Sequence, residues 1–384
     1  MSDTTTEPPL LFSPLTIGGV TLKNRVVISP MCQYSAEDGL ANDWHSVHLG
    51  QYALGGAGLV FCEAAAVEER GRITHGDLGI WSADHAAALK PVVSFLRDHG
   101  AVPGMQIAHA GRKASMQRPW YGNGPLDDSD TARGETAWDI VAPSAEPVNE
   151  GSLMPHEMSL EDIHTVQQAY ADAAGYSDAA GFEVLEIHSA HGYLSHTFLS
   201  PLSNHRNDDY GGDRAGRMRF TLEMVEKVRA VWPDHKPLFV RISSVDGAEG
   251  GWDLEDSLVL TEEMKRRGVD VMDCSSGGIA GMATATREPL PLGFRLPFSE
   301  RIRHDGAIAT MTHGLILHAQ QAEEILQDGQ ADLIGIAREA LYNPYWARHA
   351  ALELDVDREF ADWPHQYGWW LTRREAHLKS IGAR

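Results

Sequence analysis

Cysteine is scarce in this chain. Cys32, Cys62 and Cys274 are the only three among 384 residues, and no two of them form a C-x-x-C pair. An iron–sulfur cluster or a structural zinc site would therefore lack its thiolate ligands. The same scarcity argues against a disulfide framework and predicts a reduced, cytoplasmic setting.

Positive charge and long apolar runs are also lacking. Lysine and arginine number 32 against 54 acidic residues, which gives a net charge of −22. Such a surface repels nucleic acid and anionic membranes, so we expect neither as a partner. No apolar run approaches the ~20 residues needed to span a membrane. Residues 1–9 are polar and acidic, and we expect no signal peptide there.

The phosphate-binding signatures of two common folds are missing as well. The chain contains neither G-x-G-x-x-G nor G-x-x-x-x-G-K, so it offers no Rossmann fingerprint and no P-loop. What it contains is a regular alternation of short apolar runs and amphipathic segments. Predicted strands are 26–30, 59–65, 102–108, 184–187, 238–242, 269–274, 308–311 and 333–336, and predicted helices include 86–99, 160–180, 217–231, 257–267, 319–327 and 346–354.

Eight strands rich in branched apolar residues predict a parallel sheet that is buried on both faces. Eight is the closure number of a (β/α)8 TIM barrel, which we expect here, with a doubly wound open sheet as the alternative. We predict a single α/β domain over residues 1–384, with the barrel at about 11–355. An insertion after strand 3, at about 116–158, is rich in Pro, Gly, Asp and Trp. The C-terminal tail, at about 356–384, is expected to be irregular and aromatic, and either to cap its own domain or to dock on a partner subunit. We expect a homodimer or homotetramer.

The most informative motif is the run that follows the fourth predicted strand, with His188, His191 and Tyr193. Two imidazoles and a phenol that converge can hold a substrate oxygen and deliver a proton. Core histidines with satisfied hydrogen bonds are one alternative. A barrel metallohydrolase is another, and its ligands would come from His188, His191, His196, His205, Asp208 and Asp209.

Polar residues follow several other predicted strands, and the active residues of a barrel lie at those carboxyl ends. These polar residues suggest a binding site for a large, polar and negatively charged ligand. The phosphate is expected at the loops after strands 7 and 8, near Gly314, Ala337 and Arg338. Because a helix-like segment follows Arg338, its guanidinium and backbone N–H groups can share one phosphate.

Five motifs in this order resemble the Old Yellow Enzyme family, and especially its bacterial subclass of YqjM and the xenobiotic reductases. The motifs are Ser29-Pro30-Met31-Cys32-Gln33-Tyr34, Gln106 with residues 109–113, residues 186–194, residues 200–206 with 210–212, and residues 331–338. The resemblance implies an FMN-dependent NAD(P)H oxidoreductase on a (β/α)8 barrel. Tightly but non-covalently bound FMN would contact Ser29, Pro30, Met31, Cys32, Ala64, Gln106, Arg241, Gly314, Ala337 and Arg338, and NADPH or NADH would serve as reductant.

The resemblance also implies a reaction. His188 and His191 would bind the carbonyl or nitro oxygen of an activated alkene, and Tyr34 would contact the substrate from the other side. Hydride would reach the β-carbon, and a proton from Tyr193 the α-carbon. A relative that reduces dienoyl thioesters with an iron–sulfur cluster is disfavoured, because the cysteine set is missing.

Three departures from the family pattern stand out. Ala337 replaces the glycine that most relatives have before the phosphate-binding arginine. Some relatives place a C-terminal arginine in a neighbour's active site, whereas here the comparable segment ends in Trp369-Trp370. We therefore expect Trp370 to line the substrate pocket of its own or a neighbouring subunit. The 117–140 insertion has no counterpart in the shortest relatives, which leaves the pocket size open.

Overall fold

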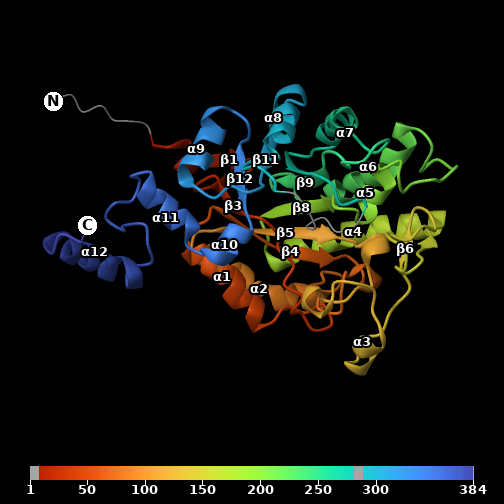
Figure 1. Cartoon of the computed structure of the whole chain (residues 1–384), viewed down its shortest axis with the longest axis horizontal. Helices are drawn as coiled ribbons and strands as arrows, with labels where there is room; N and C mark the ends of the chain where they lie inside the picture. Colours follow the sequence, from red (N-terminus) through yellow and green to blue (C-terminus); the bar gives the residue numbers. More distant parts are fainter. Residues whose placement is uncertain (1–7, 281–288, 384) are drawn as a thin grey trace.

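The structure is a computed structural model that describes residues 8–280 and 289–383. In these ranges, eight parallel strands form a closed barrel (Figure 1). The predicted (β/α)8 barrel is thus confirmed, and the alternative prediction of a doubly wound open sheet is wrong. The barrel strands are β3 (Val26–Ile28), β4 (Leu59–Ala66), β5 (Val102–Ala108), β8 (Val184–Ser189), β9 (Leu238–Ser243), β10 (Val271–Ser275), β11 (Ala309–Thr312) and β12 (Leu333–Ile336).

Helices cover the outside of the barrel. The longest, α4 (Leu160–Ala180), starts at Ser159, whose side chain forms a capping box with Asp162, and ends at Gly181 with a φ of 97°; both signals are visible in the sequence. The other helices are α1 (Asp43–Leu54), α2 (Ala83–Asp98), α5 (Leu194–Leu199), α6 (Arg214–Val231), α7 (Leu254–Arg266), α8 (Leu296–Asp305), α9 (Ala319–Gln327), α10 (Arg338–Tyr342) and α11 (Trp346–Glu353). Within the described ranges, no helix combines the length and the apolar character that a membrane crossing requires.

A short hairpin closes the amino-terminal end of the barrel. Its strands are β1 (Leu15–Ile17) and β2 (Val20–Leu22). Val20 and Leu22 pack in one apolar cluster with inward-facing residues from early in the barrel strands, such as Phe61, Val184 and Phe239. Because this end is filled with apolar side chains, polar chemistry is restricted to the carboxyl ends of the strands.

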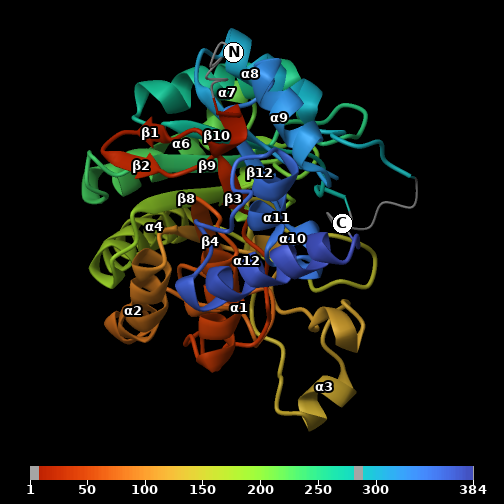
Figure 2. The same ribbon diagram turned by 90° about the vertical axis from the view of Figure 1, so that its left-hand side faces the viewer.

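The insertion at 116–158 contains only short elements: the 3-10 turn η4 (Pro119–Tyr121), α3 (Asp128–Ala132), and the parallel pair β6 (Val141–Ala142) and β7 (His156–Glu157). Figure 2 shows α3 projecting away from the barrel. The Trp138 N–H donates to Ser115 Oγ at 3.0 Å, and the Met116 N–H donates to the Ile73 carbonyl at 2.7 Å. These bonds join the two ends of the projecting segment at one place on the barrel.

The C-terminal tail is not irregular, and that prediction is wrong. Residues His365–Ser380 form the helix α12, which lies at the edge of the molecule beyond α11 (Figure 1). Of its residues only Gly368 is buried. A helix that packs so little of its surface on its own chain shows no apolar stripe facing a core, and that stripe is the signal by which helices are found in sequences.

Candidate active site

His188 and His191 meet at the carboxyl end of β8. His188 is 4% exposed, and its Nε2 lies 3.2 Å from His191 Nδ1. The Ala190 N–H donates to His188 Nδ1, so the proton of the neutral ring lies on Nε2. His188 therefore donates to His191, whose own proton lies on Nε2, 2.6 Å from Ser275 Oγ. Each neutral ring thus carries one N–H donor, and both donors are engaged here, that of His188 by His191 and that of His191 by Ser275.

The loop that carries His191 is held from two sides. His191 has a φ of 61°, a left-handed conformation that an L-residue adopts only where its surroundings enforce it. Its N–H donates to Ser243 Oγ at 2.9 Å, and its carbonyl accepts from Lys113 Nζ at 2.7 Å. Lys113 also contacts the Gly278 carbonyl. Residues at or just after the ends of β5, β9 and β10 therefore hold the loop that carries this imidazole.

Both imidazoles are neutral at physiological pH. Burial lowers the pKa of His188 to about 3, and the positive charge of Arg241 adds to this effect. Burial and Arg241 also hold the pKa of His191 well below its ordinary value. The rings therefore act as hydrogen-bond donors of unchanged charge.

A consequence for stability can be measured. In the unfolded chain His188 takes up a proton below pH 6.5, whereas the folded protein keeps it neutral down to about pH 3. Stability is therefore lost as the pH falls through this window, by about 2 kcal/mol for this imidazole at pH 5. Urea unfolding at pH 7 and pH 5 should show a smaller acid loss in His188→Asn than in the wild type. Equal losses in both proteins would contradict the buried, neutral ring.

Tyr193, Cys32 and Tyr34 form a wall beside the histidines. The Tyr193 ring centroid lies 4.8 Å from that of His188. Burial, with Cys32 and Asp77 nearby, raises the pKa of Tyr193 well above its ordinary value, so the phenol keeps its proton. Burial likewise raises the pKa of Tyr34 and of the Cys32 thiol, which lies within hydrogen-bonding reach of Tyr34.

An aromatic side chain from the insertion reaches this wall. The Trp120 ring lies edge-on to Tyr34 at 6.0 Å and is 58% exposed. No residue of the insertion was predicted to belong to the site, because Trp120 is far from Tyr34 along the chain and only the fold brings the two rings together. Trp120 and the buried Asp77, which faces Tyr193 and Cys32, are additions that the fold makes to this side of the site.

A charged cluster lies on the other side, at the ends of β9, β10 and β11. Arg241 Nε is 3.2 Å from Asp273 Oδ2, and His313 Nε2 is 3.1 Å from Asp273 Oδ1. Burial alone would raise the pKa of Asp273, but Arg241 and His313 hold it below its ordinary value. The carboxylate is therefore ionised. Sequence reasoning found Arg241 and missed Asp273 and His313.

Gln106 and Glu186 lie inside the barrel next to this cluster. Gln106 is 1% exposed, and its Nε2 donates to Glu186 Oε1 at 2.7 Å. Burial and the neighbouring Asp273 raise the pKa of Glu186 well above its ordinary value, so this carboxyl is protonated. A register shift in β4 places Ala64 opposite Gln106. These two expected cofactor contacts are therefore neighbours.

This end of the barrel fits a phosphorylated flavin. Buried Ser29 Oγ, Glu186 Oε2 and Thr312 Oγ1 find no hydrogen-bond partner among the described residues, a state that costs free energy unless a ligand supplies one. Pro30, Met31 and Cys32 continue from Ser29 as half-buried chain. Gly314 has a φ of +120°, and Ala337 leads into α10, which begins at the exposed Arg338. Polar donors, cations and backbone thus converge where FMN is expected.

Other expected residues lie elsewhere. Trp370 is 65% exposed on α12, where its ring contacts Trp369. His196 is bound to Asp246 at 2.8 Å and His205 to Glu146 at 3.1 Å, so neither joins the histidine pair. In the described ranges no three His, Cys, Asp or Glu side chains assemble as metal ligands.

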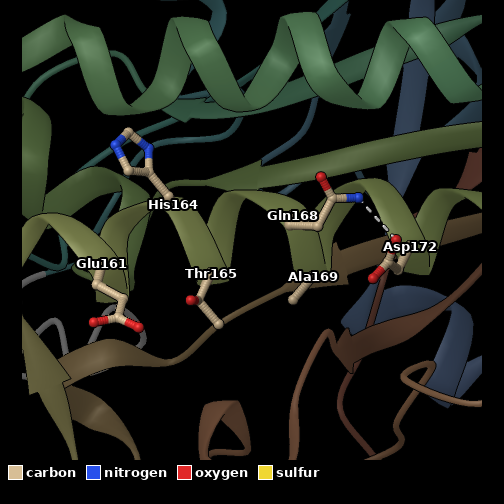
Figure 3. Close-up of a pocket in the computed structure, with 6 residues that line it drawn as sticks. All are labelled: Glu161, His164, Thr165, Gln168, Ala169 and Asp172. Carbon is tan, nitrogen blue, oxygen red and sulfur yellow. Dashed lines mark hydrogen bonds between the residues drawn. The ribbon is translucent and has the colours of Figure 1, made fainter.

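A shallow, open groove runs along α4 (Figure 3). It is lined by Glu161, His164, Thr165, Gln168, Ala169 and Asp172, all from one helix. Gln168 donates to Asp172 at 2.9 Å, and these side chains are exposed except for half-buried Ala169. A groove on one helix with no buried polar group lacks the convergence of an active site.

The closed barrel and the cations near its strand ends are typical of enzymes that hold a phosphorylated cofactor. Comparison with known proteins is more specific. A profile of the NADH:flavin oxidoreductase / NADH oxidase family matches residues 10–357. The chain belongs to this family, the Old Yellow Enzyme family, as the sequence motifs predicted. It is an NAD(P)H-dependent flavin oxidoreductase with FMN as cofactor.

Individual relatives agree with this assignment. The NADPH dehydrogenase of Geobacillus sp. (strain WCH70) is 44% identical over 362 residues, which cover 94% of this chain and 98% of that protein. The NADPH dehydrogenase of Bacillus subtilis (strain 168) is 43% identical over 349 residues, or 90% and 96% of the two chains. Among solved structures, morphinone reductase superposes with a TM-score of 0.74 at 26% identity and covers 91% of each chain.

Proposed function

We propose that this flavin oxidoreductase is an ene-reductase for alkenes activated by a carbonyl or nitro group. The observation that carries the proposal is the pair of neutral N–H donors on His188 and His191 beside the protonated phenol of Tyr193. Two donors and an acid are what the reduction of an activated C=C bond requires of a protein. The substrates would include enones, maleimides and nitroalkenes.

In this proposal the two N–H donors exchange their present acceptors, His191 Nδ1 and Ser275 Oγ, for the substrate oxygen. Negative charge grows on that oxygen as the bond is reduced, so the two N–H donors stabilise the transition state more than the ground state. Tyr193 delivers a proton to the α-carbon, and its high pKa means that the proton leaves only when the carbon becomes basic. Tyr34 contacts the substrate from the opposite side.

FMN, when bound, would accept hydride from NADPH or NADH and pass it to the alkene. We assign its ring to the backbone and side chains of residues 29–32, with Ala64 and Gln106. Arg241 would stabilise the negative charge of the reduced ring. Gly314, Ala337 and Arg338 would hold the phosphate.

We also propose that Trp370 lines a substrate pocket in a homodimer or homotetramer. Trp370 and Trp369 are both exposed on α12, and a second copy that covered this face would bury both rings. The three cysteines are free, which supports a reducing, cytoplasmic location.

The visible spectrum tests this function directly. The purified protein is expected to show a flavin band that bleaches anaerobically with NADPH or NADH and returns on addition of cyclohexenone. Cyclohexanone, which lacks the C=C bond, is the matched control and should leave the band bleached. A band that bleaches but does not return with any activated alkene would sink the ene-reductase assignment and leave the flavin oxidoreductase intact.

A further inference from the structure

A second guanidinium, that of the half-buried Arg295, enters the charged cluster from the turn before α8. Its Nε donates to Ser276 Oγ at 3.2 Å, and its NH1 donates to His313 Nδ1 at 3.1 Å. Its guanidinium lies over the Phe294 ring, with the guanidinium carbon 4.5 Å from the ring centroid. Loops after β10 and β11 thus both orient this side chain.

His313 fixes the direction of Arg295. Both ring nitrogens of His313 face an arginine donor: Nδ1 faces Arg295, and Nε2 faces Arg241 NH2 at 3.0 Å as well as Asp273. Burial, with Arg241 nearby, lowers the pKa of His313 to about 4, so the ring is neutral. It therefore orients Arg295 without cancelling its charge.

Positive charge exceeds negative charge here. Burial, then repulsion by Arg241 and Arg338, lowers the pKa of Arg295 to about 10, so it remains charged at neutral pH. In the described part of the chain, Asp273 is the ionised carboxylate that faces this group, since Glu186 is protonated. Three guanidinium groups against one carboxylate suit an anion with more than one charge.

The position of Arg295 is next to the loop where the phosphate is expected. The Gly293 N–H donates to the Gly314 carbonyl at 2.9 Å. A Cβ on Gly314 would lie 2.8 Å from the Phe294 ring, so the two turns are in close contact. Gly314 itself follows β11, one of the two strands whose loops hold phosphates in barrel enzymes.

We propose that Arg295, positioned by His313 and Ser276, is a second guanidinium for the phosphate of FMN and acts together with Arg338. The inference rests on the proposed phosphate site at Gly314 and Arg338. It implies that the enzyme discriminates strongly between FMN and riboflavin, which has the same ring and ribityl chain without the phosphate. An Arg295 that served only to balance Asp273 would affect both flavins alike.

The test compares two flavins on one variant. Holoenzyme of the wild type and of Arg295→Gln is stripped of flavin and titrated with FMN or riboflavin, with flavin fluorescence as the readout. FMN binding should weaken about 10- to 100-fold in Arg295→Gln, the effect of losing charge-assisted hydrogen bonds. Riboflavin binding should change less than about twofold. The salt dependence of FMN binding should also become shallower, because one cation is lost.

Matched variants complete the experiment. Arg301→Gln makes the same change on α8, at an exposed residue paired with Asp305 and Glu255, and should leave both affinities unchanged. Arg295→Lys keeps the charge and should recover part of the FMN affinity. Equal weakening of both flavins, or no weakening in Arg295→Gln, would overturn the proposal. Loss of enone reduction with normal FMN discrimination would overturn the proposed reaction and leave this inference standing.

Discussion

Replacing His188 or His191 by alanine is expected to lower enone turnover about 10²- to 10³-fold while FMN stays bound. Each substitution removes one N–H donor from the oxygen on which charge develops, and losing one such donor costs about this much in rate. Neither side chain belongs to the expected FMN contacts, so the flavin band should persist. His205→Ala is the matched control, because His205 is exposed and pairs with Glu146.

The measurement is kcat/KM for cyclohexenone under anaerobic conditions, together with the flavin content of each purified variant. The two single variants should show similar losses, because His188 and His191 share one hydrogen-bonded unit. Full activity in both variants would remove the histidines from the mechanism. A loss of turnover that is matched by loss of flavin would assign them to cofactor binding instead.

Arg338→Ala is expected to release FMN. The Arg338 guanidinium is exposed, and no hydrogen bond or ion pair in the described part of the chain engages it. It is therefore available to a phosphate, and its loss should weaken FMN binding about 10- to 100-fold. Absorbance of the flavin band after dialysis measures the effect. Arg358→Ala, at an exposed arginine paired with Asp355, should stay yellow; a yellow Arg338→Ala protein would contradict the assigned phosphate site.

The barrel could be predicted because its strands are buried on both sides. Runs such as 59–62 and 333–336 are continuous and apolar, and the structure places strands there, in β4 and β12. The β1–β2 hairpin could not be found, since three-residue strands are too short to show a period. Helix α12 was missed for the opposite reason: its length is ample, but few of its side chains pack on their own chain.

The candidate site likewise contains residues that the sequence predicts and residues that only the fold reveals. His188, His191 and Tyr193 lie close together in sequence, so one strand end predicts all three. His313 and Arg295 meet across separate loops, and only the fold brings them together. A usable signal existed for Asp273 and Glu186, because each is an acidic residue within an otherwise apolar strand, which is costly unless it has a partner or a function.

The insertion that carries Trp120 leaves and rejoins the barrel at neighbouring points, joined by the bond from Trp138 to Ser115. A loop whose ends already meet can double in length for about 0.6 kcal/mol. Its length and sequence can therefore drift among descendants without disturbing β8 or its histidines. The segment beside Tyr34 can therefore change independently of the strand ends that carry the histidines, and under the proposed function a new substrate preference can arise by exchanging one surface segment.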